Sequence, residues 1–166
     1  IILSAIAIKL ETTGPILFIS IRNGINDKKF KMMKLRTMFN GTEVVESGKI
    51  KEVDKKITSV GKILRKFSID EFPQFLHVLT GKMSIVGPRP ALPSQTKLIS
   101  MRKKFGINKI RPGITGFAQI NGRDKITNEQ KLIYDQIYLK KKNFYFDIII
   151  MIKTFLVIFN DKGISH

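Results

Sequence analysis

The stretch SIDEFPQFLHVLTG, residues 68–81, predicts a helix that begins beside two acidic residues. Its apolar side chains follow the i, i+3, i+4, i+7 spacing of one helix face. They are Phe72, Phe75, Leu76 and Leu79. Pro73 has no N–H group, and the first turn of a helix is where that loss is tolerated. We therefore expect Asp70 and Glu71 at the positive N-terminal end of this helix, with Gly81 as its C-terminal stop.

The position of the acidic pair allows two interpretations. Ser68 and Glu71 match the S-x-x-E capping box, a register that would place Pro73 deeper in the helix. Adjacent carboxylates at a helix start are also commonly plain capping residues that complement the helix dipole. Composition alone favours the capping role, whereas the basic residues nearby favour a functional one.

Basic residues precede the pair closely. From Lys55 onward, apolar residues at helical spacing predict a basic amphipathic helix that carries Arg65. These apolar residues are Ile57, Val60, Leu64 and Phe67. Two β-prone runs further upstream, 16–22 and 29–38, are separated by Asn-Gly and Asn-Asp and predict a hairpin. Lys34 and Arg36 lie on its second run, which we expect to fold over the carboxylates.

The chain after Gly81 is rich in turns up to Arg123. A helix over about 93–104 interrupts it, and a Thr127/Gln130 capping box predicts a further helix to about residue 142. Arg89 lies between two prolines in Gly-Pro-Arg-Pro, which is either a simple turn or a stiff loop that holds an arginine for phosphate. Arg111 and Arg123, each beside proline or glycine, allow the same two interpretations.

Composition limits the class of protein. The chain has 166 residues, 43% of them hydrophobic, which is enough for one compact domain. Its formal net charge of +17 suits polyanionic partners such as nucleic acid, anionic lipid or nucleotide-sugar phosphates. The absence of cysteine excludes disulfides, Fe–S clusters and thiolate zinc sites.

Both ends of the sequence are apolar, but neither contains about eighteen uninterrupted apolar residues, the length that a membrane-spanning helix needs. Residues 1–10 are interpreted as the remnant of a hydrophobic membrane helix, and residues 11–166 as one further domain. The run 144–159 is rich in Ile, Phe and Leu but contains Asp147 and Lys153. It is expected either to pack in the core or to lie at a bilayer surface.

Carboxylates and cations in one cleft would suit phosphoryl transfer. Positive groups and a metal stabilise charge on the transferring phosphate, while an ionised carboxylate attacks phosphorus or binds Mg²⁺. Mg²⁺ needs only carboxylate oxygens, phosphates and water, which this chain is expected to supply. His77 lies within an apolar run, and His166 is the only other histidine, so His77 is interpreted as structural.

Four segments together resemble the bacterial sugar transferase family, the monotopic polyprenol-phosphate phosphoglycosyl transferases. They are KLRTM at 34–38, SIDEFPQ at 68–74, GKMSIVGPRP at 81–90 and RPGITGFAQINGR at 111–123. The likeness runs from about Gly14 to about Asp161. Phe117 and Asn128 depart from the family, which often has tryptophan at these two positions.

The resemblance implies an activity and a set of residues. Asp70 would be the nucleophile that attacks the β-phosphate of a UDP-sugar, releases UMP and carries the phosphosugar until undecaprenyl or another polyprenol phosphate takes it. Asp70 would also ligate Mg²⁺, and Glu71 would be the base or positioning carboxylate for the acceptor. The cations expected around the phosphates are Lys34, Arg36, Arg65, Arg89, Arg111 and Arg123. Asp135, Tyr138 and Asp147 also match family positions, where a structural role is the alternative.

The expected fold is α/β, a small antiparallel hairpin with several amphipathic helices on the cytoplasmic face of the inner membrane. By resemblance, the family's re-entrant membrane helix precedes it and is largely missing from this sequence. Two other functions remain open, a basic nucleic-acid-binding module and a non-catalytic membrane-surface scaffold. No recognised nucleic-acid motif is present, so nucleic acid is not the expected partner. The sequence names neither the sugar nor the oligomeric state.

Overall fold

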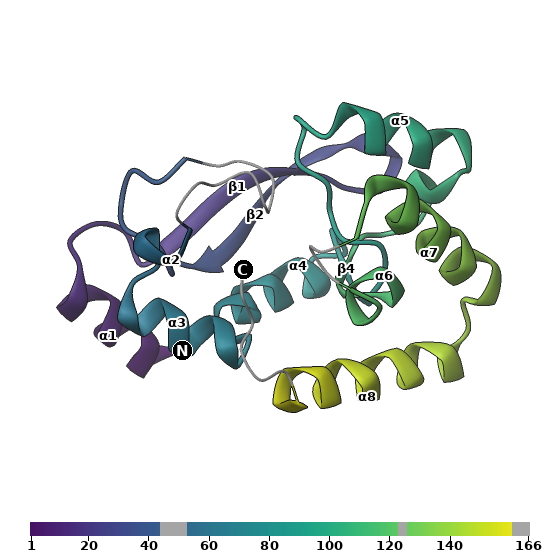
Figure 1. The fold of residues 1–166 in the computed structure, drawn as a ribbon. Coiled ribbons are helices and arrows are strands. Elements are labelled where there is room, and N and C mark those ends of the chain that lie inside the picture. Colours follow the sequence, from purple (N-terminus) through teal and green to yellow (C-terminus); the bar gives the residue numbers. More distant parts are fainter. Residues whose placement is uncertain (44–52, 123–125, 161–166) are drawn as a thin grey trace.

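The computed structural model describes residues 1–43, 53–122 and 126–160 (Figure 1). β1 (Leu17–Asn23) and β2 (Lys29–Leu35) form an antiparallel pair, with Leu17 opposite Leu35 and Asn23 opposite Lys29. A short 3-10 turn, η1 (Ile25–Asp27), joins them. Two of its residues, Asn26 and Asp27, have positive φ, a conformation that Asn and Asp tolerate better than most residues. The predicted hairpin is therefore confirmed.

Two helices pack below the open end of the hairpin. α1 (Ile2–Glu11) lies against α3 (Ser59–Lys66), which follows the single turn of α2 (Val53–Lys56). The Glu11 carboxylate accepts hydrogen bonds from the backbone N–H groups of Ser59 and Val60, at 2.6 and 3.1 Å, and so caps α3 from another element. The cluster beneath is apolar and buried. It consists of Ile8, Leu35 and Leu64, with Ile16, Val60 and Ile69 around them.

The stretch 68–81 folds as two short helices, a 3-10 helix η2 (Ile69–Gln74) and α4 (Phe75–Leu79). Ser68 has φ 54 and its side chain makes no capping hydrogen bond, so the alternative Ser68–Glu71 capping box is wrong. The reason is geometric: a residue in the left-handed region does not have the extended backbone of an N-cap. Asp70 and Glu71 lie in the first turn as expected, and Gly81 follows α4 with φ 71.

A second, parallel strand pair lies beyond α4, and the sequence did not predict it. β3 (Ser84–Val86) pairs with β4 (Gly113–Thr115), three residues each. Glycine is required here because the two backbones nearly touch. A Cβ on Gly113 would lie 2.1 Å from the Gly87 nitrogen, and one on Gly116 would lie 2.0 Å from the Gly87 carbonyl oxygen.

The remaining helices build a second core. They are α5 (Thr96–Lys104), η3 (Ile107–Lys109), α6 (Phe117–Ile120), α7 (Asn128–Lys141) and α8 (Phe144–Asn160). The predicted helix at 93–104 is confirmed as α5, and the Thr127/Gln130 capping box forms at the start of α7. Val86, Tyr138 and Ile150 form the buried centre of this core. Ile150 is fully buried, so α8 packs in the core along one face, as one of the two alternatives had it. Several other side chains of α8 are exposed, and a place at a bilayer surface stays a prediction.

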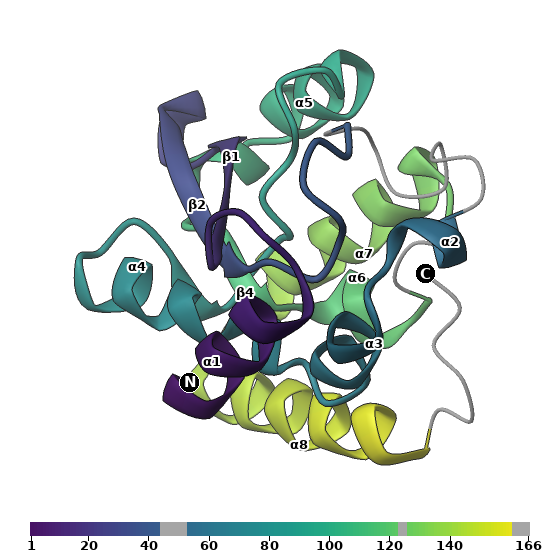
Figure 2. The same ribbon diagram turned by 90° about the vertical axis from the view of Figure 1, so that its left-hand side faces the viewer.

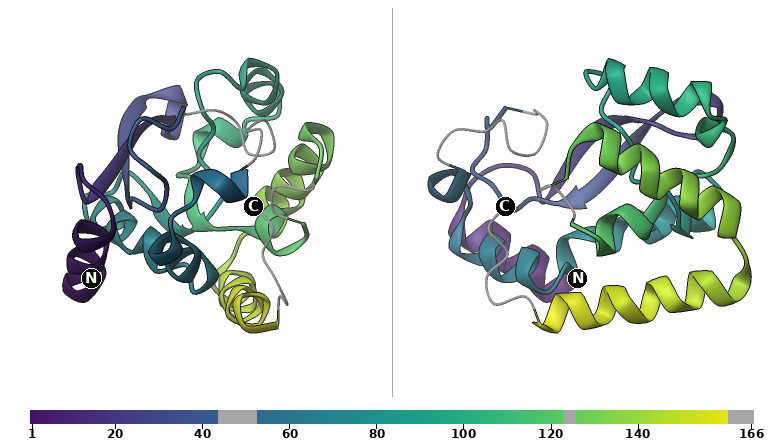
Figure 3. Two further views of the ribbon diagram at one scale, coloured as in Figure 1. Left: turned by 60° about the vertical axis from the view of Figure 1, so that its left-hand side comes forward. Right: turned by 45° about the vertical axis from the view of Figure 1, so that its right-hand side comes forward.

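The elements arrange in two opposed sides, which Figures 1 and 2 show at right angles. α1, α3, α4 and α8 lie along the lower side, and α5 lies at the top beside the hairpin. The two further views in Figure 3 keep this division. The fold is mixed α/β, as expected. Among the described residues, no helix is both long and apolar enough to cross a membrane.

Candidate active site

The acidic pair lies between the two cores. Ile69 packs on the first cluster, and Val86, which begins the segment leading to Arg89, belongs to the second. The turn of η2 buries Asp70, which is only 7% exposed, whereas Glu71 is partly exposed. A carboxylate this deeply buried is uncommon unless it is paired with a positive group. The surroundings of Asp70 therefore decide what it can do.

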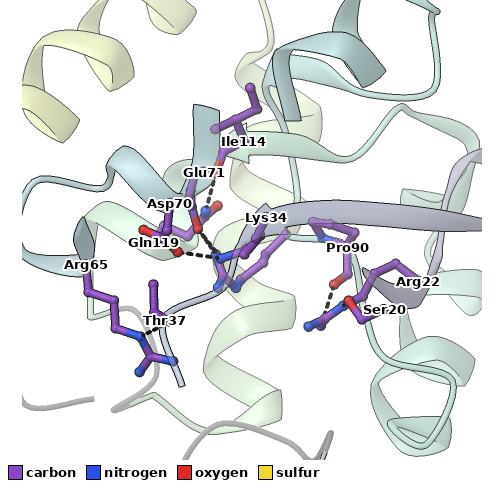
Figure 4. Close-up of polar contacts among 11 residues, drawn as sticks. Ser20, Arg22, Lys34, Thr37, Arg65, Asp70, Glu71, Pro90, Ile114 and Gln119 are labelled. Carbon is purple, nitrogen blue, oxygen red and sulfur yellow. Dashed lines mark hydrogen bonds and ion pairs between the residues drawn. The ribbon is translucent and has the colours of Figure 1, made fainter. Parts of the chain in front are cut away.

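Lys34 supplies the principal pairing and comes from β2, which packs on η2. Its Nζ donates to Glu71 Oε1 at 2.5 Å and lies 3.7 Å from Asp70 Oδ2. Figure 4 shows the three side chains pointing toward one another. The predicted proximity of Lys34 to both carboxylates is thus observed, although its role toward substrate remains a prediction.

Arg89 reaches the acidic pair from the loop that follows β3. Its Nη1 lies 3.6 Å from Glu71 Oε1, and 39% of its side chain is exposed. The loop places this cation at the edge of the cluster, where a guanidinium accessible to solvent is suited to bind an incoming phosphate in its planar fork.

Arg65 and Arg36 make different contacts. Arg65 donates through Nε to Thr37 Oγ1 at 2.8 Å, and its charge acts on Asp70. Arg36 is buried and its guanidinium donates to the backbone carbonyls of Thr13 and Thr12, so it fastens the segment between α1 and β1. β2 ends at Leu35, one residue before Arg36, and the contacts given for the Arg36 guanidinium are with these two carbonyls.

The other two predicted arginines, Arg111 and Arg123, have different outcomes. Arg111 is exposed, and its Nη2 approaches the position that a Cβ of Gly81 would occupy, at 3.9 Å, beyond the end of α4. Arg123 lies outside the described residues. Their proposed phosphate contacts remain predictions.

The electrostatics of Asp70 combine opposing effects. Burial raises the pKa of this carboxyl, the Lys34 ammonium lowers it, and the neighbouring Glu71 carboxylate raises it again. Arg65 and Arg89 lower the pKa further, but the net direction is upward. Asp70 is therefore an acid whose ionised form depends on the cations around it, which is typical of functional sites.

Two supporting residues were not singled out from the sequence. Thr37 accepts the hydrogen bond that orients Arg65. Gln119 donates through Nε2 to the Ile114 carbonyl oxygen at 2.8 Å (Figure 4), while its buried Oε1 has no hydrogen-bond partner among the described residues. Both residues lie inside the family-like segments, but hydrogen bonds between distant elements leave no local pattern. His77 accepts a hydrogen bond from the Met33 N–H at Nε2, in agreement with its structural interpretation.

A magnesium ion would find few protein ligands here. Within the described ranges, no group of three or more His, Cys, Asp or Glu side chains could hold a metal. Asp70 and Glu71 nevertheless fit the mode in which Mg²⁺ takes one or two carboxylates and completes its shell with substrate phosphates and water. Lys34 already occupies Glu71 Oε1, which favours Asp70 as the ligand, and a role of Asp70 toward Mg²⁺ stays a prediction.

Comparison with known proteins agrees with this architecture. A profile described as bacterial sugar transferase matches residues 1–161. The chain is 38% identical to "Uncharacterized sugar transferase EpsL" of Bacillus subtilis (strain 168), which covers all of this chain and 81% of that protein. It is 39% identical to "UDP-glucose:undecaprenyl-phosphate glucose-1-phosphate transferase" of Escherichia coli (strain K12) over 96% of this chain.

A third relative is "UDP-N-acetylgalactosamine-undecaprenyl-phosphate N-acetylgalactosaminephosphotransferase" of Aeromonas hydrophila, 34% identical over 96% of this chain. The chain spans only 36% of the Escherichia coli protein and 39% of the Aeromonas hydrophila protein. The family profile covers nearly the whole chain, including the elements that carry Asp70, Glu71, Lys34 and Arg89. The chain therefore belongs to the bacterial sugar transferase family.

Proposed function

We propose that this chain transfers a sugar-1-phosphate from a UDP-sugar to a polyprenol phosphate such as undecaprenyl phosphate. The observation that carries the proposal is a buried carboxylate, Asp70, held beside Lys34 and within the field of Arg65 and Arg89. The related enzymes named above act on UDP-sugars and undecaprenyl phosphate, which supports the substrate classes.

The proposed reaction has two steps. Asp70 attacks the β-phosphorus of the UDP-sugar, a bond forms from its carboxylate oxygen to phosphorus, and the bond to the bridging oxygen breaks. UMP leaves with that electron pair. In the second step an oxygen of the polyprenol phosphate attacks the same phosphorus, the acyl-phosphate bond breaks, and the Asp70 carboxylate is regenerated.

We assign each neighbour of Asp70 a role in this reaction. Lys34 favours the ionised form of Asp70, because its ammonium lowers the pKa of this carboxyl against the effect of burial. Arg89 binds a phosphate oxygen, and Glu71 accepts the proton of the acceptor phosphate when that group arrives protonated. Mg²⁺, held by Asp70, would supply positive charge for the phosphate oxygens when it is bound.

The acceptor is a lipid, so the site should open toward a membrane, and the lower side of the molecule is suited to this. Phe72 and Phe75 follow the catalytic pair directly and are about half exposed. On the same side, Leu79 is 83% exposed and Phe155 is 62% exposed. Large apolar side chains left exposed on one side of a molecule favour an interaction site there. Exposed lysines accompany it, namely Lys9, Lys62, Lys66, Lys82 and Lys153.

We therefore place this side on the cytoplasmic leaflet of the inner membrane, with the apolar side chains in the lipid and the lysines near anionic headgroups. Replacing both Leu76 and Leu79 by serine should reduce co-sedimentation with vesicles of anionic and neutral phospholipids several-fold. Phe105→Ser is the matched control, because this half-exposed residue follows α5 on the opposite side. Equal losses in both variants would contradict the orientation.

The transfer itself is tested with purified protein, Mg²⁺, a panel of UDP-sugars and undecaprenyl phosphate in detergent. Formation of a polyprenyl-diphosphate sugar with stoichiometric UMP is the expected result. Asp70→Asn should abolish both products. Release of UDP in place of UMP would refute the proposed bond cleavage, and a binding module or scaffold would give no product with any sugar.

A further inference from the structure

The loop that presents Arg89 is held in place by side chains of three other elements. It runs from Val86 at the end of β3 to Pro90. The Tyr138 hydroxyl shares its one proton between the Val86 carbonyl oxygen, at 3.1 Å, and Asp147 Oδ1, at 3.0 Å. At the other end, Arg22 of β1 donates to the Pro90 carbonyl at 3.4 Å (Figure 4).

The third anchor acts on Arg89 itself. Arg102 of α5 donates through Nη1 to the carbonyl oxygen of Arg89 at 2.8 Å. The same guanidinium binds Asp135 of α7 through Nε at 2.8 Å and Nη2 at 2.7 Å. Two nitrogens of the Arg102 guanidinium thus bind Asp135, and the third, Nη1, donates to the backbone of Arg89. The side chain of Arg89 lies 3.6 Å from Glu71.

This ion pair is buried, with Arg102 only 8% and Asp135 only 2% exposed. Burial raises the pKa of Asp135, while the Arg102 charge lowers it. Buried ion pairs are poor devices for simply joining two helices, because apolar residues of similar volume do so as well or better. α5 and α7 are also joined at the surface, by Lys97 and Glu129 at 2.6 Å. What an apolar pair could not do is donate to the Arg89 carbonyl.

We propose that Arg102 and Asp135 are positioning residues that hold the backbone of Arg89, so that its guanidinium is aimed at the phosphates beside Glu71. Asp135 orients the guanidinium of Arg102, and Arg102 in turn holds the loop through its hydrogen bond to the Arg89 carbonyl. Tyr138, one turn after Asp135 on α7, fixes the start of the same loop. The role in catalysis rests on the proposed phosphosugar transfer.

A double-mutant cycle separates positioning from a general loss of structure. Lysine at position 102 keeps a charge for Asp135 but has no planar fork to serve both partners. We expect Arg102→Lys to lower kcat about tenfold in the parent, a smaller loss than the roughly hundredfold effect of a misplacement by about 1 Å. In the Arg89→Ala background the same substitution should change kcat less than about twofold, since nothing remains to position. A merely structural role would lower kcat by the same factor in both backgrounds and would overturn the inference.

A second measurement does not depend on the reaction. In detergent-bound protein labelled with ¹⁵N at arginine, the Nε–Hε signal of Arg89 is assigned by its absence from Arg89→Ala. We expect the chemical shift of this signal to move toward that of a free arginine side chain in Arg102→Lys and in Asp135→Asn. It should stay unchanged in the control Lys97→Gln, which breaks only the surface pair between the same helices. An Arg89 signal unaffected by either core substitution would overturn the positioning role even with transfer intact. If the parent catalyses no transfer but the Arg89 signal changes as expected, the proposed function is refuted and the positioning of Arg89 by Arg102 and Asp135 is supported.

Discussion

Replacing Lys34 by methionine tests how far its ammonium favours the ionised form of Asp70. Lys34 lies 2.5 Å from Glu71 and 3.7 Å from Asp70, and the substitution keeps the apolar stem while removing the charge. Removing one member of a fully buried ion pair costs about 3–5 kcal/mol. The Lys34 and Glu71 side chains are 17% and 19% exposed, so solvent screens part of the loss. We expect a cost of about 2 kcal/mol.

The sign of the pH dependence follows from the pKa of Asp70. Burial already raises this pKa above its unfolded value, and loss of the Lys34 ammonium raises it further. The folded variant then binds more protons than the unfolded chain, so its stability should fall as pH rises above the unfolded value of about 4. The deficit relative to the parent should therefore be smaller at pH 5 than at pH 8.

Thermal unfolding at these two pH values measures the effect. For a chain of this length, a cost of about 2 kcal/mol corresponds to a Tm about 4–8 °C lower. The acid limb of the kcat profile should also move to higher pH, because the nucleophile must be ionised to attack. Lys31→Met is the matched control, since it removes the same charge from an exposed position on the same strand. Equal Tm values and equal pH profiles for the two variants would refute the reasoning.

Three further substitutions test individual contacts by thermal and denaturant unfolding. Asp70→Asn should abolish transfer yet raise the free energy of unfolding by about 1 kcal/mol at pH 7, because burial disfavours the carboxylate; the gain should vanish below about pH 4, where the parent is protonated too. Tyr138→Phe should cost about 1–2 kcal/mol, because the hydroxyl bonds Val86 and Asp147; an unchanged denaturation midpoint would contradict this. Glu11→Gln should lower Tm by about 2–4 °C at pH 7, because its carboxylate caps α3, and this loss should disappear as pH falls below about 4.

Much of the local structure was predictable because it depends on short-range patterns. The hairpin follows from its turn residues, and α7 begins at a capping box that the sequence spells out. The acidic pair at a helix start follows from Pro73. The helix after it was expected to be apolar on one face, and the structure shows that Leu76 and Leu79 on that face are exposed. Periodicity locates such a face but does not say whether protein or lipid covers it.

The site was predictable only in part, because its geometry depends on contacts between distant segments. Lys34 was placed correctly, but the strand ends at Leu35 and Arg36 binds the chain before β1 instead. The pair of Arg102 and Asp135 joins residues 33 positions apart, a separation that leaves no periodic signal. The parallel strands β3 and β4 have three residues each, too few for a recognisable pattern.

Covalent capture of the phosphosugar tests the central claim most directly. The parent protein is incubated with Mg²⁺ and a UDP-sugar without lipid acceptor, and its intact mass is compared with that of Asp70→Asn. The account predicts a mass increase of one phosphosugar with equimolar UMP in the parent, and neither in the variant. An unmodified parent that still forms polyprenyl-diphosphate sugar once undecaprenyl phosphate is added would contradict the account, because transfer would then be direct and Asp70 would not be the nucleophile.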